Sequence, residues 1–116
     1  MNIEELRIFC LNLNQVTESF PFDTSTLVFK VEGKIFAIIP LDAFDTQITL
    51  KCNPEKAIML RETYDCITPA WHMNKKYWNT IYINHLITKQ LISDLIIHSY
   101  NEVLAKIPRI QKKHEC

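Results

Sequence analysis

"TLVFKVEGKIFAII", Thr26 to Ile39, is the stretch that decides the fold of this 116-residue chain. Both halves of the stretch are rich in β-branched and aromatic residues, which favour β-strands. Between the halves, Glu32 and Lys34 flank Gly33, the only glycine of the chain, at a place where a tight turn uses a positive φ. The stretch therefore predicts a β-hairpin over residues 26–39.

Two later segments alternate between apolar and polar residues, as half-buried strands do. Segment 47–52 places its apolar side chains on one face, and segment 78–83 places Asn79 on the face opposite Trp78 and Thr80. We therefore expect two further strands here. Segments 17–26 and 64–77 show no regular period, and both are predicted to be loops.

Three helices are predicted, each from an N-cap residue followed by apolar residues at helical spacing. The first also has a capping-box glutamate, and the second has a proline at its first helical position. The caps are Asn2, Asn53 and Thr88, and the helices are expected to end near residues 13–14, 63 and 104.

The resulting order is helix, three strands, helix, loop, strand, helix. Strands that follow one another closely favour an antiparallel sheet, which buries its apolar face against helices. The prediction is a two-layer α+β fold, with an antiparallel β-sheet packed against N-terminal, middle and C-terminal helices. The length suits a single domain over residues 1–116, with a short basic C-terminal tail from about Lys106.

The net charge of zero hides an uneven distribution of charged residues. Residues 1–50 contain three basic and seven acidic residues, whereas residues 51–116 contain ten basic and six acidic residues. Such a division is typical of a basic face for an anionic partner, although chance clustering also produces it. No apolar run approaches the ~20 residues that span a bilayer. The N-terminus lacks the basic region of a secretory signal, so we expect a cytoplasmic protein without a membrane partner.

Residue types that carry catalysis or bind cofactors are not arranged in recognisable motifs. One glycine cannot supply a phosphate-binding loop, and the four cysteines show no metal-binding or redox spacing. Cys10 and Cys52 are expected to be buried, His85 to lie in a turn, and His98 to be a partly buried residue of the last helix. Cys66 and Ser99, the candidate nucleophiles, lie in no nucleophile elbow. We predict no catalytic activity, no metal and no cofactor.

The most distinctive stretch is "AWHMNKKYWNTIYI", residues 70–83. In one interpretation, Trp71 and Trp78 fill the end of the core and the adjacent lysines form a solvated turn. In the other, the buried rings stiffen a loop whose polar tip binds phosphate oxygens. Lys30 and Lys51, on nearby strands, would extend this basic surface. The tip would present His72, Asn74, Lys75, Lys76 and Asn79.

The chain resembles the MmcQ/YjbR family of small bacterial proteins, which have a CyaY-like (frataxin-like) fold. The most specific match is "TPAWHMNKKYWNT" over residues 68–80, and the match extends at collinear positions over nearly the whole chain. The other matching segments are "FPF" at 20–22, "TLVFKV" at 26–31, "GKIFA" at 33–37, "LKCNPE" at 50–55, "LRE" at 60–62, "SY" at 99–100 and "AKIP" at 105–108.

The resemblance implies a DNA-binding protein with a double-wing arrangement and no defining catalytic activity. Because the chain is neutral overall, we expect DNA binding to be weak and salt-sensitive. The alternative is an adaptor that binds a protein or a small ligand in a cleft between the sheet and the 64–77 loop. An unrecognised enzyme is a third hypothesis. The family motif places the nucleic-acid contacts at Lys51, His72, Asn74, Lys75, Lys76 and Asn79.

Overall fold

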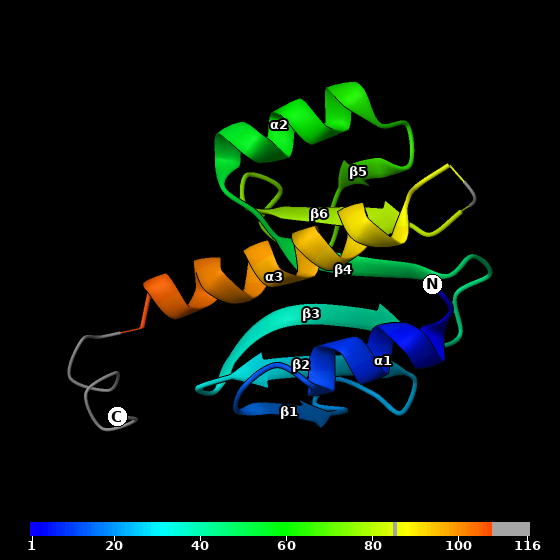
Figure 1. The fold of residues 1–116 in the computed structure, drawn as a ribbon. Helices are drawn as coiled ribbons and strands as arrows, with labels where there is room; N and C mark the ends of the chain where they lie inside the picture. The colour runs from blue at the N-terminus through cyan, green and yellow to red at the C-terminus, as the bar shows by residue number, and fades with distance from the viewer. Residues whose placement is uncertain (85, 108–116) are drawn as a thin grey trace.

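The computed structural model describes residues 1–84 and 86–107, and this part of the chain forms an antiparallel sheet with helices on one face (Figure 1). The expectations for His85 and for the tail beyond residue 107 lie outside the described residues. The strands are ordered β1-β2-β3-β4-β6-β5. The elements are α1 (Ile3–Leu11), β1 (Val16–Ser19), β2 (Thr26–Val31), β3 (Lys34–Pro40), β4 (Gln47–Lys51), α2 (Pro54–Thr63), β5 (Ile67–Pro69), β6 (Trp78–Tyr82) and α3 (Lys89–Ala105).

The predicted hairpin is confirmed as β2 and β3, joined by a two-residue turn. Val31 pairs with Lys34, and both turn residues have positive φ angles, 52° at Glu32 and 74° at Gly33. Positive φ at both positions is the conformation whose twist matches that of the flanking strands. A Cβ at Gly33 would meet no atom within 4 Å, so the turn needs glycine for its backbone angles and not for space.

The two-layer α+β prediction is confirmed, as are the caps at Asn2, Asn53 and Thr88. The first helix ends at Leu11, two to three residues earlier than predicted. Two segments predicted to be loops contain short edge strands, so that part of the prediction is wrong. The first of them, β1, is held to α1 by the Arg7 guanidinium, which donates two hydrogen bonds of 2.6 and 2.7 Å to the Glu18 carboxylate.

The second missed strand, β5, lies at the opposite edge of the sheet and ends at Pro69. Proline lacks an N–H and is therefore tolerated at a sheet edge. Strands of four and three residues are too short for alternation to stand out from the surrounding loop sequence. Their positions are set by pairing with β2 and β6, which is a long-range effect.

One face of the sheet forms the core with the three helices of the described part of the chain. This core contains Leu6 and Cys10 from α1, Ala57 from α2 and Ile92 from α3, all with no exposed surface. The predicted inward face of β4, with Ile48 and Leu50, lies in the same core. Within residues 1–84 and 86–107, no helix is both long and apolar enough to cross a membrane.

The opposite face of the sheet, which we call the open face, carries loops in place of helices. Its central row is made of threonines, because Thr49 pairs with Thr80 and Thr80 pairs with Thr68 across three neighbouring strands. The Thr49 and Thr80 hydroxyl oxygens are 3.1 Å apart, at hydrogen-bonding distance. This face is therefore more polar than the core face, and it is the side on which a ligand has access to the sheet.

His98 of α3 is partly buried, as expected, and it supports the start of α2. The backbone N–H of Asn53 donates a 3.2 Å hydrogen bond to His98 Nε2, which must be unprotonated to accept it. Burial and the nearby Lys56 ammonium lower the pKa of His98 below its ordinary value, while Glu102 opposes the shift. The fold therefore favours the neutral imidazole.

We expect this contact to make stability depend on pH below neutrality. Because the pKa of His98 is lowered in the folded state, the unfolded chain takes up the proton first as the pH falls below about 6.5. The free energy of unfolding, measured with urea, should therefore fall more steeply with decreasing pH in the natural protein than in His98→Gln. His72→Gln, which changes an exposed histidine, is the control. Equal slopes in all three proteins would contradict the prediction.

Candidate functional site

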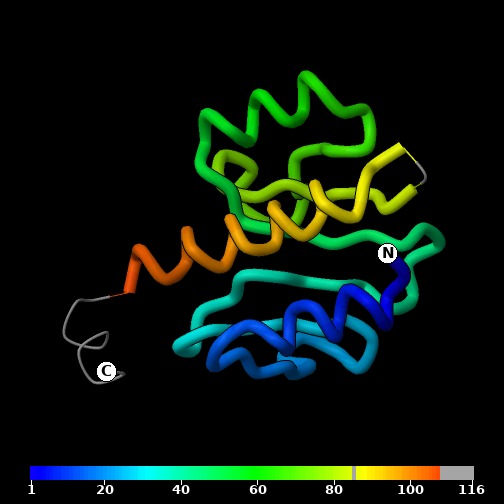
Figure 2. The backbone as a smooth tube through the Cα atoms, in the orientation of Figure 1, coloured from blue at the N-terminus to red at the C-terminus, as the bar shows by residue number. Residues whose placement is uncertain are grey.

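The sheet opens between β3 and β4, and this opening shapes the candidate site. The described pairing of these strands consists of Ala37 with Leu50 and Ile38 with Thr49. A bulge leaves Phe36 without a β2 partner, because Phe29 pairs with Ala37 whereas Lys30 pairs with Ile35. On the N-terminal side of this bulge, β3 starts from the hairpin turn, whereas the chain after β4 continues into α2 (Figure 2). The two strands thus diverge at one end.

Ser99 of α3 bridges the diverging strands with its side chain. The backbone N–H of Lys51 donates a 2.8 Å hydrogen bond to Ser99 Oγ, and Ser99 Oγ donates a 2.6 Å hydrogen bond to the Phe36 carbonyl. The hydroxyl is fully buried, so both backbone groups would otherwise lie away from water without a partner. Ser99, a candidate nucleophile in the sequence, is therefore a structural residue that holds the opening in shape.

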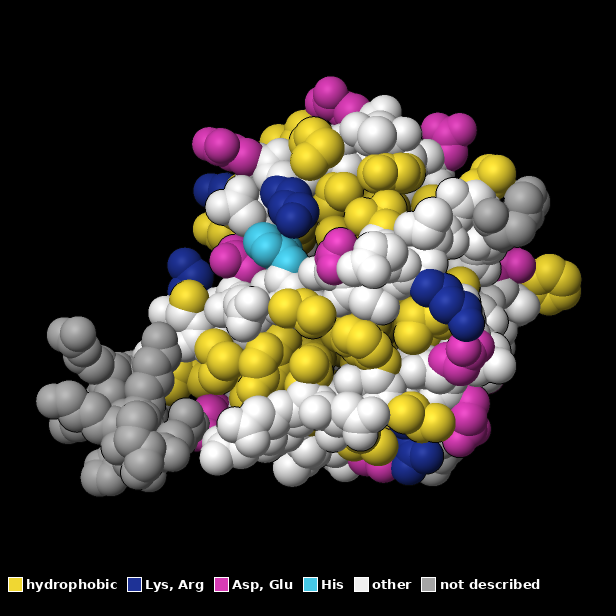
Figure 3. Space-filling view, in the orientation of Figure 1, with side chains coloured by type: hydrophobic (Ala, Val, Ile, Leu, Met, Phe, Trp, Pro, Cys, Tyr) yellow, Lys and Arg dark blue, Asp and Glu magenta, His cyan; other side chains and the backbone are white. Residues whose placement is uncertain are grey.

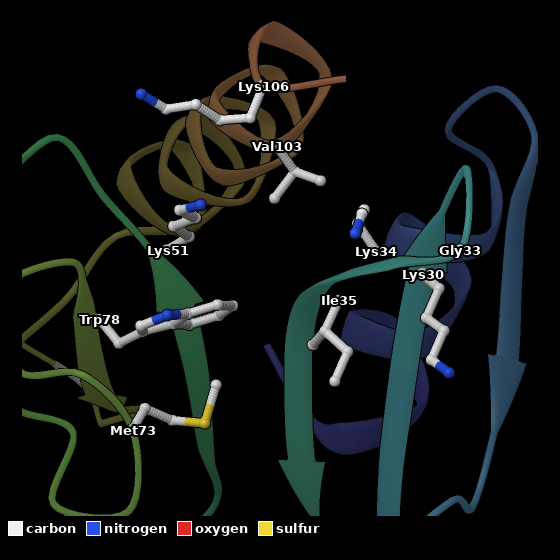
Figure 4. A pocket seen from close by; sticks show the side chains of 9 residues that line it. All are labelled: Lys30, Gly33, Lys34, Ile35, Lys51, Met73, Trp78, Val103 and Lys106. Carbon is white, nitrogen blue, oxygen red and sulfur yellow. The ribbon is translucent and has the colours of Figure 1, made fainter. Parts of the chain in front are cut away.

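A groove of about 530 Å³ occupies the opening, and we call it the lysine groove. Its walls come from the hairpin, from β4 and β6, and from the C-terminal end of α3, which meet because the strands have separated (Figure 4). Four of its nine lining residues are lysines, and none of the nine is acidic. The lining consists of Lys30, Gly33, Lys34, Ile35, Lys51, Met73, Trp78, Val103 and Lys106.

The lysines approach the groove from different elements and keep their charges available. Figure 4 shows Lys51 and Lys106 on one side of the opening and Lys34 on the other, while the Lys30 and Lys106 amines point away from its centre. Among residues 1–84 and 86–107, the two ion pairs are Arg7–Glu18 and Lys89–Glu5, so none of the groove lysines is neutralised there. On the helix face, by contrast, Lys and Arg are scattered among Asp and Glu (Figure 3). The groove is therefore a local concentration of positive charge.

A second hollow lies on the open face and matches the predicted cleft between the sheet and the 64–77 loop. This aromatic cleft has a volume of about 510 Å³ and shares Met73 with the lysine groove. Trp71 and Phe22, at 66% and 62% exposed, bound it from two separate loops. The full lining is Phe22, Asp23, Thr26, Ile38, Pro40, Gln47, Thr49, Ala70, Trp71, His72, Met73, Thr80 and Tyr82.

The lysines of the 70–77 loop lie over aromatic rings. The Lys75 ammonium is 4.2 Å from the centroid of the Trp71 ring, and the Lys76 ammonium is 5.5 Å from that of Tyr77. Both distances allow cation–π attraction. The rings thus orient the two charges on an exposed loop.

The predicted anchoring of this loop is only partly correct. Trp78 is 9% exposed and is therefore buried, as expected. Trp71, by contrast, is largely exposed and cannot be a buried anchor. Asn79 is 2% exposed, so the expectation that it is presented at the loop tip is wrong. Its amide donates to the Ala57 carbonyl of α2 at 3.3 Å, because the alternation of β6 directs it to the core face.

Arg61 of α2, which the sequence analysis did not single out, supplies the missing anchor. Its Nε donates a 2.6 Å hydrogen bond to Asn79 Oδ1, and its terminal nitrogen donates to the Lys75 carbonyl. Asn74 completes the turn, because its side chain accepts a 3.0 Å hydrogen bond from the backbone N–H of Lys76. The loop is thus held by the Arg61 guanidinium, which reaches it from the helix layer. An arginine two residues before the end of α2 is only a weak signal in the sequence.

The predicted site residues fall into four places, one of which is the core position of Asn79. Lys51 lines the lysine groove, His72 lines the aromatic cleft, and Asn74 lies in the loop between β5 and β6 with Lys75 and Lys76. The structure adds Lys34 and Lys106 to Lys51 and brings Lys30 to the same groove. Lys34 and Lys106 were missed because each is an ordinary charged residue at the end of an element.

The described residues contain no group of three or more His, Cys, Asp or Glu side chains that would hold a metal ion. Burial raises the pKa of the Cys10 thiol to about 12 and that of the Cys52 thiol to about 11, so both remain protonated at neutral pH. These two cysteines are core residues, as the sequence indicated.

Comparisons with known proteins identify similar chains in several bacteria. The model of the YjbR family matches residues 11–102. YbdF of Escherichia coli O157:H7 is 34% identical over 110 residues, covering 95% of this chain and 90% of its own. YjbR of Escherichia coli K12 is 28% identical over 113 residues, covering 97% and 96%. Both of these relatives are described as uncharacterized.

Solved structures also resemble the fold closely. Protein DR2400 of Deinococcus radiodurans, a DUF419 domain, superposes with a TM-score of 0.92 at 31% identity, covering 97% of this chain and 86% of that one. A Pseudomonas syringae protein, target PsR293, has a TM-score of 0.72 at 26% identity, covering 85% and 96%. The two-layer arrangement is thus shared with experimentally determined structures.

We expect Ser99→Ala to lower stability by about 1–3 kcal/mol, because it leaves a buried N–H and a buried carbonyl without their shared partner. Urea unfolding followed by circular dichroism measures this change. Ser93→Ala makes the same substitution on the same helix at a half-buried position and is the control. A loss no larger than that of Ser93→Ala would show that the hydroxyl bridge contributes nothing.

We expect Arg61→Gln to loosen the 70–77 loop, since the shorter side chain cannot contact both Asn79 and the Lys75 carbonyl. Amide hydrogen exchange at Tyr77 and Trp78, whose N–H groups donate to the Asn74 carbonyl, should become faster. Exchange in the β2–β3 hairpin should stay unchanged and is the internal control. Uniformly faster exchange would indicate global destabilisation instead of a local anchor.

Proposed function

This chain belongs to the YjbR family, and we propose that it is a non-catalytic DNA-binding module that holds backbone phosphates in the lysine groove. The supporting observation is the groove itself, whose lysines come from the hairpin, β4 and the end of α3 while no acidic side chain lines it. Residues distant in the sequence are thus brought to one concave surface of a single charge sign.

The shape of the groove strengthens the attraction of those charges for an anion. Its other lining residues are glycine and apolar side chains, among them Trp78 and Val103. Charges of one sign in a concave site with low-dielectric walls focus the electric field on the opening. Lysine ammonium groups bind phosphate as point charges and require no fixed angle. This property suits the flexible sugar-phosphate backbone of DNA.

The exposed 70–77 loop adds a second set of contacts beside the groove. Met73 lines the groove, and Lys75 and Lys76 follow it on a loop that Arg61 fixes. We propose that a strand of nucleic acid that leaves the groove past Met73 next contacts Lys75 and Lys76. This arrangement supports a role for Lys51, His72, Asn74, Lys75 and Lys76 in binding, with Asn79 acting through the Arg61 anchor.

The neutral net charge limits the strength of the proposed interaction. Each phosphate contact adds about 0.7–0.9 to the magnitude of the slope of log affinity against log salt concentration. A few lysines in one groove therefore give a modest slope and weak binding. The second candidate function, an adaptor for a protein or small ligand, is favoured by the aromatic cleft, where aromatic and other uncharged residues predominate.

The test replaces Lys34 and Lys51 together by alanine and measures binding of labelled DNA by fluorescence anisotropy at several salt concentrations. Loss of two phosphate contacts should weaken binding about 10- to 100-fold at low salt and reduce the salt slope by about 1.5. Lys56→Ala with Lys89→Ala removes the same charge outside the groove and should change both quantities far less.

Unchanged affinity and slope in the Lys34/Lys51 variant would argue against phosphate binding in the groove. Binding of a lysate component that survives both nuclease treatment and high salt would favour the adaptor function instead. Circular dichroism of both double variants checks that the fold is intact, which is expected because none of the four lysines is fully buried.

A further inference from the structure

We infer that the DNA ligand is single-stranded, with a phosphate in the lysine groove and an unstacked base in the aromatic cleft. This inference rests on the proposed function and adds the strand state of the ligand. It starts from the position of the two hollows, which share Met73 as a lining residue. The lysine groove suits the negatively charged phosphate of a nucleotide. The aromatic cleft, lined mainly by uncharged residues, suits its neutral base.

The aromatic residues of the cleft are placed where a base can stack on them. Trp71 and Phe22 are both more than three-fifths exposed, although they come from loops on two different parts of the chain. Large exposed rings that converge on one hollow indicate a binding site more than a packing role. Every base has an aromatic face, and stacking on such rings contributes without sequence preference.

The inner part of the cleft offers hydrogen-bonding groups to the edge of a base. The hydroxyls of Thr49 and Thr80 come from neighbouring strands, and the side chains of Gln47 and His72 lie around them. Base edges contain both donors and acceptors, which match this mixed set of groups.

The one acidic residue of the cleft orients the ligand. Asp23 accepts hydrogen bonds from the backbone N–H groups of Ser25 and Thr26 at 2.9 and 2.7 Å. The Ser25 hydrogen bond and the hydroxyl of Thr26 lower the pKa of Asp23, so its carboxylate is charged at neutral pH. A negative charge here repels phosphate and tolerates a neutral base. The positive charges of the lysine groove, by contrast, attract phosphate.

A duplex cannot use this pair of sites. In a double helix the bases are paired and stacked inside, so no aromatic face is free to enter a recess on a protein. The cleft volume of about 510 Å³ lies in the range of small-molecule sites and suits a single nucleoside unit. A single strand presents unstacked bases at little cost and satisfies both hollows at once.

The experiment compares three labelled probes of equal length: an oligothymidylate, the same backbone with abasic sites throughout, and a duplex. We expect the oligothymidylate to bind more tightly than either of the other two. Trp71→Leu should weaken oligothymidylate binding about 5- to 150-fold, the range of one stacking contact. It should weaken binding of the abasic strand far less, through loss of the ring that lies beneath the Lys75 ammonium. Phe44→Leu is the matched control, because Phe44 is fully exposed but lines neither hollow.

Tryptophan fluorescence gives a second readout. Trp71 is exposed and Trp78 is buried, so quenching by the oligothymidylate should be large in the natural protein and lost in Trp71→Leu. Equal affinity for the oligothymidylate and the abasic strand, or tighter binding of the duplex, would overturn the inference while phosphate binding stands. Binding of none of the three probes would overturn the proposed function itself.

Discussion

The hydroxyl of Ser99 is the contact on which the candidate site depends. By accepting from the Lys51 N–H and donating to the Phe36 carbonyl, it joins two strands at the point where their own ladder stops. A continuous ladder between β3 and β4 would close the opening. An opening without the Ser99 bridge would leave buried backbone groups without partners. The bridge also fixes α3 relative to β4, which places Lys106 near Lys51 at the groove. One small side chain thus connects the helix layer, the sheet and the site.

The second determinant is the separation of charge between neighbouring hollows. The molecule is neutral, and its two ion pairs among the described residues lie outside the lysine groove. The groove collects lysines without acids, while the aromatic cleft contains Asp23 and no lysine. Net charge governs long-range attraction, but the local distribution decides where an anion can settle. A neutral protein can therefore contain a well-defined anion site and bind at modest strength.

Much of the fold could be predicted because local signals and tertiary structure agree. The Glu32-Gly33 turn, the Asn53-Pro54 start of α2 and the alternation of β4 each reflect short-range chemistry. The site was less accessible to sequence reasoning. Lys34 and Lys106 lie far apart in the chain and line the same groove only because β3 and β4 diverge, which no periodicity indicates. Trp71 was expected inside because large aromatic residues are usually buried, and its exposure is one of the observations that motivate the proposed base site.

Asn79 and Arg61 illustrate how a residue can serve a site without touching a ligand. The family-like motif around residues 68–80 contains Asn79, yet the alternation of β6 directs its side chain away from the open face, into the core. There it accepts from Arg61, whose other nitrogen holds the Lys75 carbonyl. The motif therefore encodes two layers at once: exposed groups on one side of β6 and the anchor of their loop on the other. A loop held by an arginine needs no buried tryptophan beneath it, so Trp71 can stay exposed at the cleft while its ring lies beneath the Lys75 ammonium.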